Sequence, residues 1–493
     1  MTRIAVVGAG LAGLAAAHEL TELGADVTIL ERTRLVGGKA TSFEAGGVEV
    51  DNGQHVFLGC FDAWRRLVRA VEAEDQLYLQ PRFETVLLAR GGRSARLRAA
   101  GLPAPWHLGP ALLGHRLLGV SGRLQVARAM RAASEPAGAD ETVAQWLDRQ
   151  GQGERARAAF WEPFLVPALN APLTEAAAEA GRFVLTTAFL GGPEACRIGW
   201  SRVPLARIAE AVAARSGSLQ LRSPVTELRV RDGRLRALVV QHQEHAQEVE
   251  VDGAVLAVPP GPLARLLGQP ERFGVTGLER FATQPIVDVH LWYDGARPSW
   301  EFAALVGSPV QWVFQKQPGY LCCSLSAAGD TVRRPETDLV RLCHEELAAA
   351  VPELRGQSPR EGRATRDPEA TFVPRPGLQR PGAATTVPNL VLAGAWTDTG
   401  WPATMESAVR SGSAAARTLA GRLVAESDAA GAPEEVSPGG RAAAPDVTMA
   451  LGSGPGPAAA RGDSPHRPSQ LGGTPPQRPT EARARWRTTG GLR

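Results

Sequence analysis

The sequence has 493 residues, 44% of them hydrophobic, and a formal net charge of +3. This length exceeds one ordinary domain and allows a substantial buried core. The near-neutral charge is not a nucleic-acid signature, and no apolar run is long enough to cross a bilayer, which argues against those two classes of protein.

Charged residues and cysteines are distributed unevenly. From Arg441 to Arg493 there are 8 arginines and 3 acids, a net of +5, which leaves −2 for the remainder. Only Lys39 and Lys316 are lysines among the 54 basic residues, so both are singled out. The five cysteines form no Cys-x-x-Cys pair, which predicts a reducing cytoplasm without a disulfide framework or a metal site. The N-terminal apolar run is interrupted by glycines and does not read as a signal peptide.

Residues 3–31 predict a strand, a glycine turn, a helix and a second strand. The apolar run 3–7 leads into Gly8, Gly10 and Gly13, a helical pattern continues to Leu23, and the strand 27–30 ends on Glu31. Such short, predominantly apolar strands are typical of a buried parallel sheet.

Strand and helix patterns alternate along the rest of the chain. Asp62 is expected to cap a short helix. We expect strands at 78–98 around a Gly91–Gly92 turn, at 219–221, 225–230, 235–240, 254–258, within 283–330 and at 390–393, and helices at 141–190 (broken at Pro163, Pro167 and Pro172), 203–216, 337–350 and 405–419. After about Ser427 the chain lacks apolar periodicity and is rich in Pro, Gly, Ala, Ser and Arg, which predicts a disordered tail.

The segment 102–133 combines leucines and arginines in a helical pattern. Two interpretations fit this pattern. We favour a helical pair packed on the core, and the alternative is a surface that touches lipid.

The glycine spacing after the first strand predicts a dinucleotide site. Gly8 permits a tight turn, Gly10 lets the backbone approach a diphosphate, and Gly13 lets the helix pack on the strand. Leu11 and Ala12 open that helix and direct their N–H groups at the phosphates. Glu31, with Arg32 beside it, is placed to meet a ribose. A glycine turn without a ligand is the less favoured alternative.

A second glycine pair follows at Gly37 and Gly38, with Lys39 next to it. Glycines beside cations can add contacts to a diphosphate. Residues 31–39 resemble the second nucleotide motif of the FAD-dependent amine oxidase and phytoene desaturase superfamily, which implies FAD. That family usually has Arg at the position of Lys39, and lysine keeps the charge but loses the bidentate fork.

The C-terminal segments 390–397 and 405–412 resemble the closing FAD motif of the same superfamily. The resemblance implies that Gly394, Ala395, Thr404 and Met405 lie at the flavin, with a helix N-terminus aimed at its pyrimidine ring. The family usually has an acid at Ala395 and glycine at Ser407, so a direct side-chain contact from residue 395 is missing. We consider Asp398 a nearby substitute for that acid. Residues 223–226 and 254–260 resemble the middle segment of the family, which places Val225 at the adenine.

Residues 50–60 and 395–404 together resemble the squalene-associated branch of this superfamily, the hydroxysqualene dehydroxylases. Related carotenoid desaturases share a Gly-x-His stretch but not this combination. The resemblance implies an α/β fold with a Rossmann-like FAD-binding domain (1–77, 200–270 and 383–425), a discontinuous α+β substrate-binding domain (78–199 and 271–382), and a disordered tail (426–493).

The resemblance implies FAD-dependent reductive dehydroxylation of hydroxysqualene to squalene in hopanoid biosynthesis. An allylic hydroxyl can leave as water if it is protonated, and reduced FAD can supply a hydride. We expect His55 to be the proton donor, because its unperturbed pKa lies near the operating pH, with Asp51, Cys60 and Asp398 as further candidates. The other interpretation is that 51–55 only shapes a loop against the flavin.

Two alternatives remain open at this point. A carotenoid-type desaturase or isomerase would use the same cofactor, whereas an amine oxidase is disfavoured because Trp396 and Trp401 do not form an obvious aromatic pair. A non-catalytic lipid-binding subunit would explain Ala395.

The implied substrate is a long apolar isoprenoid, so we expect a cytoplasmic protein that contacts the inner face of the membrane peripherally. The segment 102–133 is the candidate for that contact, and the basic tail can add attraction to anionic lipid. Association with squalene-pathway synthases is a further expectation, and nucleic acid is not.

Overall fold

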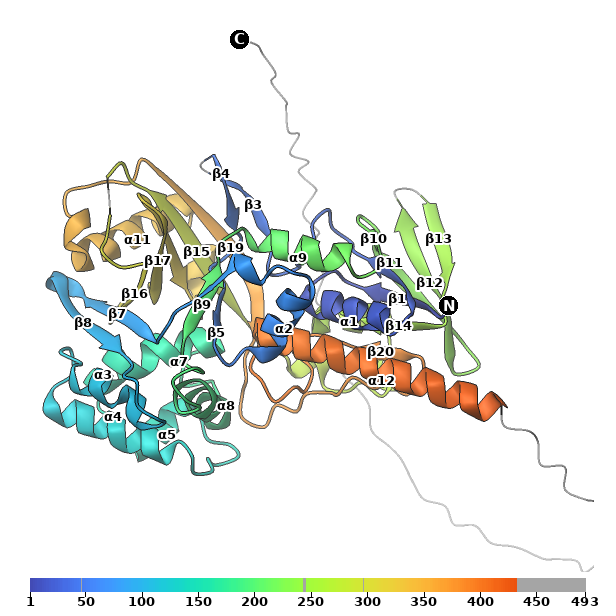
Figure 1. Cartoon of the computed structure of the whole chain (residues 1–493), viewed down its shortest axis with the longest axis horizontal. Helices are drawn as coiled ribbons and strands as arrows, with labels where there is room; N and C mark the ends of the chain where they lie inside the picture. Colours follow the sequence, from blue (N-terminus) through green and yellow to red (C-terminus); the bar gives the residue numbers. More distant parts are fainter. Residues whose placement is uncertain (46, 243–244, 296, 432–493) are drawn as a thin grey trace, which may run out of the picture. The chain divides into compact units, whose positions relative to one another are not determined.

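Five parallel strands form the first sheet of the protein, seen in a computed structural model that describes residues 1–45, 47–242, 245–295 and 297–431 (Figure 1). The strand order is β10–β2–β1–β14–β20, with β1 at Arg3–Val7, β2 at Asp26–Leu30, β10 at Ser218–Gln220, β14 at Gly253–Leu256 and β20 at Leu390–Leu392. We call it the cofactor sheet. Every residue of β14 and β20 is buried, as expected for a parallel sheet covered on both faces.

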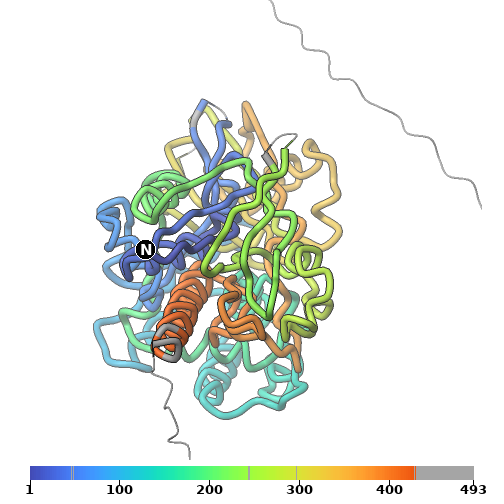
Figure 2. Tube along the Cα trace, turned by 90° about the vertical axis from the view of Figure 1, so that its right-hand side faces the viewer, coloured from blue at the N-terminus to red at the C-terminus, as the bar shows by residue number. Residues whose placement is uncertain are grey.

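Alternate residues of β1 enter two different cores. Ile4 and Val6 pack with the helices α1, α2, α9 and α12, whereas Ala5 and Val7 pack against an antiparallel sheet and α10. Figure 2 views these layers with α12 directed toward the viewer. The helices are α1 Leu11–Glu22, α2 Asp62–Ala70, α9 Leu205–Ala214, α10 Pro260–Leu267 and α12 Met405–Gly431, and the antiparallel strands are β11 Val225–Arg231, β12 Arg234–His242 and β13 His245–Glu250.

A seven-stranded mixed sheet forms the second half, in the order β19–β15–β18–β17–β16–β7–β8. We call it the substrate sheet. Its strands are β7 Glu84–Ala89, β8 Arg93–Arg98, β15 Thr283–Trp292, β16 Phe302–Leu305, β17 Trp312–Gln317, β18 Tyr320–Leu325 and β19 Glu361–Phe372. Helix α11 (Glu336–Ala350) packs on one face through Leu339, Cys343 and Leu347.

A helical region packs on the opposite apolar side of the substrate sheet around Trp146, Trp161 and Phe164. Its elements are η3 Trp106–Leu108, α3 Gly109–Leu113, α4 Val120–Ala132, α5 Val143–Arg149, α6 Glu154–Ala156, the π-helix Arg157–Trp161, α7 Glu162–Leu169, α8 Ala178–Val184 and the π-helix Leu185–Phe189.

Short strands and turns complete the described chain. Two strands, β3 Ser42–Ala45 and β4 Val48–Asp51, form a hairpin, and β5 Val56–Leu58, β9 Ile198–Ser201 and β6 Leu77–Leu79 form a small sheet. The 3₁₀ turns are Glu74–Gln76, Arg90–Gly92, Pro270–Phe273, Leu278–Arg280, Gly329–Arg333 and Pro352–Leu354.

The predicted α/β fold is confirmed, and three local expectations are wrong. Pro163 and Pro167 do not break the helix, because Pro163 lies in the first turn of α7 and Pro167 lies inside it. Residue 167 has no N–H to offer the carbonyl of Pro163, and the indole Nε1–H of Trp312 donates to that carbonyl instead, at 2.9 Å.

Asp62 does not cap α2. It is the first residue of the helix, and no side chain at its N-cap position makes a capping bond.

The predicted start of the tail, at residue 426, is also wrong. Helix α12 continues to Gly431 rather than ending before residue 426, and an ion pair between Glu426 and Arg234 ties this last part to β12. The remainder of the predicted tail, 432–493, lies outside the described residues. Within residues 1–431 as described, no helix is long and apolar enough to span a membrane.

Candidate functional site

Two glycine loops meet backbone to backbone at the carboxyl ends of β1 and β2. The Gly37 N–H donates to the Ala9 carbonyl at 2.8 Å, and Gly10 and Gly37 form an isolated parallel bridge. A Cβ on Gly38 would lie 2.9 Å from the Cα of Gly10, so the contact has no room for a side chain. Gly37 and Gly38 both have positive φ, which glycine adopts without strain. The structure thus brings the two predicted glycine motifs together.

The first turn of α1 fits a diphosphate. Gly10 is the N-cap and has no side chain to satisfy the first N–H groups of Leu11, Ala12 and Gly13. A Cβ on Gly13 would lie 1.9 Å from the Gly8 carbonyl oxygen, whereas the nearest atom to a Cβ on Gly10 is the Gly38 Cα, 3.9 Å away. Gly13 is therefore required by packing, and the open space above Gly10 suits an anion.

Glu31 lies at the ribose position that the sequence predicts and also supports the loop. Its Oε2 accepts from Ala9 N at 2.9 Å and its Oε1 from Thr33 N at 2.8 Å. A carboxylate can accept further bonds, so a ribose contact stays a prediction. The Ser223 N–H donates to the Glu31 carbonyl at 2.8 Å, which brings the segment before Val225 beside the glycine loops. Arg32 is exposed.

Lys39 follows the second glycine pair, but its side chain extends to the substrate sheet instead of covering the glycine loops. Its Nζ is 2.8 Å from Asp367 Oδ2 and 2.6 Å from the Glu369 carbonyl, both on β19. A diphosphate contact from Lys39 would require another rotamer.

The start of α12 and the chain before it form the predicted flavin end of the site. Ser407 donates from Oγ to the Ala395 carbonyl at 3.1 Å, and its N–H donates to Thr404 Oγ1 at 3.2 Å. Gly394 has a φ of +152° and donates from N–H to Ser411 Oγ at 2.9 Å. Serine at 407, where the family usually has glycine, thus ties down the loop that carries Ala395. Met405 is the first residue of α12.

Asp398 lies on the surface of the turn after this loop. Its Oδ1 accepts from Gly400 N at 3.3 Å. The Arg380 side chain packs against this turn and donates to the carbonyls of Thr397 and Trp401. Substitution of Asp398 for the missing acid stays a prediction.

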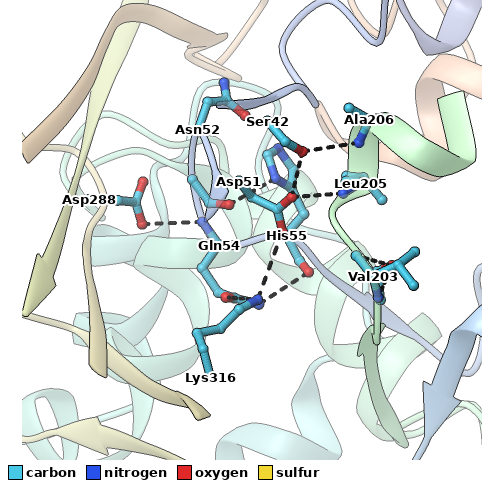
Figure 3. A network of polar contacts seen from close by, with 12 residues as sticks. Ser42, Asp51, Asn52, Gln54, His55, Val203, Leu205, Ala206, Asp288 and Lys316 are labelled. Carbon is cyan, nitrogen blue, oxygen red and sulfur yellow. Dashed lines mark hydrogen bonds and ion pairs between the residues drawn. The ribbon is translucent and has the colours of Figure 1, made fainter. Parts of the chain in front are cut away.

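Asp51 caps helix α9 (Figure 3). Its Oδ1 accepts from Leu205 N at 2.7 Å and from Ser42 Oγ at 2.9 Å, and Ser42 Oγ accepts in turn from Ala206 N at 3.1 Å. This arrangement satisfies the first N–H groups of α9 and joins β4 to that helix. Asp51 has a positioning role in this structure.

Lys316 and Asp288 are site residues that the sequence did not assign. Lys316, on β17, donates to Gln54 Oε1 at 3.0 Å and lies 3.8 Å from Asp51 Oδ2. Asp288, on β15, accepts from Gln54 N at 3.3 Å (Figure 3). The scarcity of lysine pointed to Lys316, whereas Asp288 lies in an ordinary strand pattern. Together they hold the loop 51–55, called here the clamp loop, against the substrate sheet.

The carboxyl of Asp288 is buried beneath the clamp loop. A Cβ on Gly53 would lie 2.8 Å from Asp288 Oδ2, so only glycine leaves room for the carboxyl there. Burial raises the pKa of Asp288 to about 6, so it holds a proton at higher pH than an exposed aspartate. Two residues on, His290 shares its strand face and bonds Tyr320 through Nδ1 at 2.8 Å, and burial lowers the pKa of His290 to about 4.

His55 and Cys60 are weak proton donors in this structure. Burial lowers the pKa of His55, which leaves the ring neutral at physiological pH. Its Nδ1 lies 3.1 Å from the Gly53 carbonyl, which can only accept, so Nδ1 carries the hydrogen and Nε2 is the free acceptor. Burial raises the pKa of the Cys60 thiol to about 12. Burial thus disfavours the protonated form of His55 that would donate a proton, and the Cys60 thiol releases its proton only well above neutral pH.

Glu406 is a buried residue whose role the sequence did not reveal. Its carboxylate accepts from Ala63 N at 3.0 Å and Trp64 N at 2.9 Å, and from Arg410 Nε at 2.7 Å. It therefore caps α2 from α12, the task that the sequence assigned to Asp62.

The sheet order, the two glycine loops and the helix behind them define a FAD-dependent oxidoreductase. The family described as flavin containing amine oxidoreductase matches residues 11–420. A hydroxysqualene dehydroxylase from Sinorhizobium fredii is 30% identical over 439 residues, which cover 83% of this chain and 96% of that protein. The chain therefore belongs to the flavin containing amine oxidoreductase family, and within it to the branch of the hydroxysqualene dehydroxylases.

Further relatives are similar to the chain over most of their length, and a solved structure shares its fold. A hydroxysqualene dehydroxylase from Rhodopseudomonas palustris is 29% identical, covering 83% of this chain and 96% of that protein. A 15-cis-phytoene desaturase from Synechococcus elongatus is 26% identical, covering 85% and 96%. Among solved structures, cyclohexylamine oxidase from Brevibacterium oxydans has a TM-score of 0.65 at 18% identity, covering 86% of this chain and 99% of that one, which shows a shared fold.

Proposed function

We propose that this FAD-dependent oxidoreductase reduces hydroxysqualene to squalene as a step of hopanoid biosynthesis. The observation that supports the substrate is the extent of the similarity to the Sinorhizobium fredii protein, because 83% of this chain includes both the cofactor sheet and the substrate sheet. Cofactor motifs alone would support only the class of enzyme.

The reaction exchanges a hydroxyl for a hydrogen. The allylic C–O bond breaks as a proton joins the hydroxyl, which leaves as water, and the remaining cation is delocalised over the double bond. Bound at the glycine loops around Gly10 and Gly38, reduced FAD would supply the hydride and two electrons, so that one hydroxysqualene and one reduced flavin would give one squalene, one water and one oxidised flavin. The protein must supply the proton and exclude bulk water from the cation.

Asp288 is the side chain best suited to supply that proton. Its burial beneath Gly53 raises its pKa, so the carboxyl keeps its proton to higher pH than an exposed acid. The hydrogen bond from the Gln54 N–H holds the carboxyl against the clamp loop. The predicted donors are occupied or unsuited: Asp51 caps α9, and Asp398 is at the surface. His55, neutral and with a free Nε2, is suited to orient the hydroxyl rather than to protonate it.

An assay with purified protein tests the proposal. The protein is incubated anaerobically with chemically reduced FAD and hydroxysqualene, and the products are identified by gas chromatography with mass spectrometry. We expect squalene and an equal amount of oxidised flavin. Flavin oxidation without squalene, or squalene without flavin oxidation, would contradict the proposed reaction.

A carotenoid-type desaturase or isomerase is the second candidate, favoured by the 26% identity to a phytoene desaturase. Parallel incubation with phytoene and oxidised FAD separates the two, because desaturation would reduce the flavin and lengthen the conjugated chromophore. A protein that cannot take up FAD at all would instead support the non-catalytic lipid-binding subunit that Ala395 suggested.

A further inference from the structure

Large exposed apolar side chains occur close together in the sequence, on η3, α3 and α4 and just before them. Helix α3 contacts both η3 and α4, and Figure 1 shows α3 and α4 in the same region of the protein. Trp106, Leu113, Val120 and Leu124 expose 67–72% of their surfaces, and Leu102 exposes 45%. In the rest of the described chain, large exposed apolar side chains occur at separate positions, which are Met1, Leu23, Leu35, Leu221, Val230 and Val424. Single exposed leucines are normal, whereas a group of them marks a surface that meets a partner.

Most of these exposed apolar residues belong to helices and not to loops. Val120 and Leu124 lie one turn apart on α4, and the exposed Arg128 and Arg131 continue the same face. The opposite face of α4 packs into the core through Val126. The helical pair is therefore packed on the core, as the favoured interpretation predicted, and it also carries an apolar outer face.

The segment that carries this face has charges of one sign. From Thr85 to Ser134 the sequence has eight arginines and no Asp or Glu. Arg90, Arg96 and Arg98 pair with acids of other segments, but Arg116, Arg128 and Arg131 form no ion pair with any described residue. Uncompensated cations therefore flank the exposed leucines and the tryptophan.

We propose that this face docks the protein on a bilayer that contains anionic phospholipid. The docking face consists of Leu102, Trp106, Leu113, Arg116, Val120, Leu124, Arg128 and Arg131. Leucine and tryptophan side chains enter the boundary between headgroups and acyl chains, and arginines meet the lipid phosphates.

A second copy of the chain is a poorer partner for the docking face. A two-fold contact would place the same arginines of two subunits against each other without acids to neutralise them. An anionic lipid surface neutralises all three at once. The charge therefore favours lipid over self-association.

The apolar core beneath the docking face extends to the chain that follows the clamp loop. One apolar cluster extends from Leu117 and Leu118, beneath the face, to Val56 and Leu58, just after the clamp loop. In a docked protein, one packed apolar core would thus lie between the membrane and the chain that follows the clamp loop. Lipid binding itself requires neither flavin nor substrate, so the docking proposal can fail or stand independently of the proposed reaction.

Vesicle sedimentation of the full chain with bound FAD tests the proposal. Vesicles of phosphatidylcholine with phosphatidylglycerol are compared with vesicles of phosphatidylcholine alone. We expect the double variant L113S/L124S to lower binding to the anionic vesicles by about tenfold or more. We expect R116Q/R131Q to lower binding to the anionic vesicles but to leave the weaker binding to neutral vesicles unchanged. The control V424S removes an exposed apolar side chain of α12 that lies outside the docking face, and this variant should bind like the wild type.

Two further measurements keep the result decisive. In a full-length variant whose arginines from Arg441 to Arg493 are replaced by glutamine, binding should persist; loss of binding there, with L113S/L124S unaffected, would assign the contact to the tail and overturn the proposal. Light scattering should show the same mass for the wild type and L113S/L124S. A wild-type dimer that L113S/L124S converts to a monomer would assign the face to a second copy. Circular dichroism and flavin absorbance confirm that each variant is folded.

Discussion

His55 belongs to the clamp loop and Asp288 lies beneath it, and burial moves their pKa values in opposite directions. A Cβ on Gly53 would lie 2.8 Å from Asp288 Oδ2 and 3.9 Å from His55 Cε1, so both side chains border one small space. Burial raises the pKa of Asp288 to about 6 and lowers that of His55, because each buried group avoids its charged form. A carboxyl that titrates near pH 6 beside a neutral imidazole is a common arrangement for proton transfer.

The substitution Asp288→Asn tests the acid directly. We expect turnover of hydroxysqualene to fall by about 10²–10⁴-fold, the usual contribution of a general acid. The flavin spectrum and KM should stay near those of the wild type, because Asn keeps the shape and the bond from Gln54. In the wild type, turnover should decline as pH rises through about 6, where the acid loses its proton, and in Asp288→Asn this decline should disappear.

His55→Ala is the matched comparison. It should lower turnover less than Asp288→Asn and leave the flavin spectrum near normal. Unchanged turnover would remove His55 from the mechanism, and a larger loss than in Asp288→Asn would return the acid role to His55.

Gly10 and Gly13 are needed for different reasons. Glycine at 13 leaves room for the Gly8 carbonyl, whereas glycine at 10 leaves open the space proposed for the diphosphate. A Cβ on Gly10 would meet no protein atom closer than 3.9 Å, and its φ of −74° suits any residue. We therefore expect Gly10→Ala to leave the apoprotein folded and equally stable while FAD binding weakens by about tenfold or more, because the methyl group would occupy the space of the diphosphate. Titration of the apoprotein with FAD and thermal unfolding without FAD measure the two effects.

Gly421→Ala supplies the control for Gly10→Ala. Its Cβ would meet nothing within 4 Å on α12. FAD affinity should be unchanged, and helix stability should rise by about 0.5–1 kcal/mol. If Gly10→Ala binds FAD like the wild type, the space above Gly10 does not hold the diphosphate.

At the scale of elements, the sequence predicts the helices and strands whose formation depends on residues close in the sequence. Strand β2, in which Val27, Ile29 and Leu30 are buried, and the glycines on either side of α1 predict the cofactor sheet without information from distant residues. Pro167 shows the limit, because proline in a helix is tolerated only where a distant group, Trp312 Nε1, satisfies the released carbonyl. That partner is not visible in the local pattern.

Glu406 shows the same limit between two helices. It is 343 residues from Ala63 in the sequence, yet its carboxylate supplies the cap of α2. A local pattern that begins with Asp62 therefore predicted the helix correctly and its cap incorrectly.

The substitution Glu406→Gln tests this link between α12 and α2. The amide leaves one oxygen for the N–H groups of Ala63 and Trp64 and turns a donor toward one of them. We expect the free energy of unfolding to fall by about 2–4 kcal/mol, because a buried charged acceptor is lost. Denaturant unfolding of the FAD-bound protein measures the loss.

Glu19→Gln is the matched control. It removes the ion pair between Glu19 and Arg417, which also joins two helices of the cofactor layer but lies near the solvent. A change of about 1 kcal/mol or less is expected there. Equal losses in Glu19→Gln and Glu406→Gln would show that the buried carboxylate has no special role.

At the scale of the molecule, the site forms where the two sheets meet. Lys39 reaches Asp367 on β19, Lys316 reaches Gln54, and the bond from Gln54 to Asp288 joins residues 234 positions apart. The cofactor half of this site could be predicted because its motifs are continuous in sequence. Asp288 could not be predicted as the acid, because nothing in the sequence of the strand 283–292 indicates that the clamp loop packs on its carboxyl.

The buried Asp288 and His290 make opposite contributions to the pH dependence of stability. Unfolding returns the pKa of Asp288 from about 6 to an ordinary value, so between about pH 4 and 6 the folded chain holds more protons, and this contribution to stability falls as pH rises. Unfolding returns the pKa of His290 from about 4 to about 6.5, so its contribution falls as pH drops through the same window. In the wild type the two contributions offset each other.

Asp288→Asn should remove one side of this balance. Relative to the wild type, its free energy of unfolding should rise by about 3 kcal/mol between pH 4 and pH 7, because the wild type must bury a charge at pH 7 and the variant does not. The variant should therefore lose stability on acidification more steeply than the wild type. Denaturant unfolding at a series of pH values measures the difference, with Asp398→Asn as the control for an exposed carboxylate. Parallel curves for Asp288→Asn and the wild type would show that Asp288 is ionised at no cost in the folded protein, and the proton for the leaving hydroxyl would then have to come from another group.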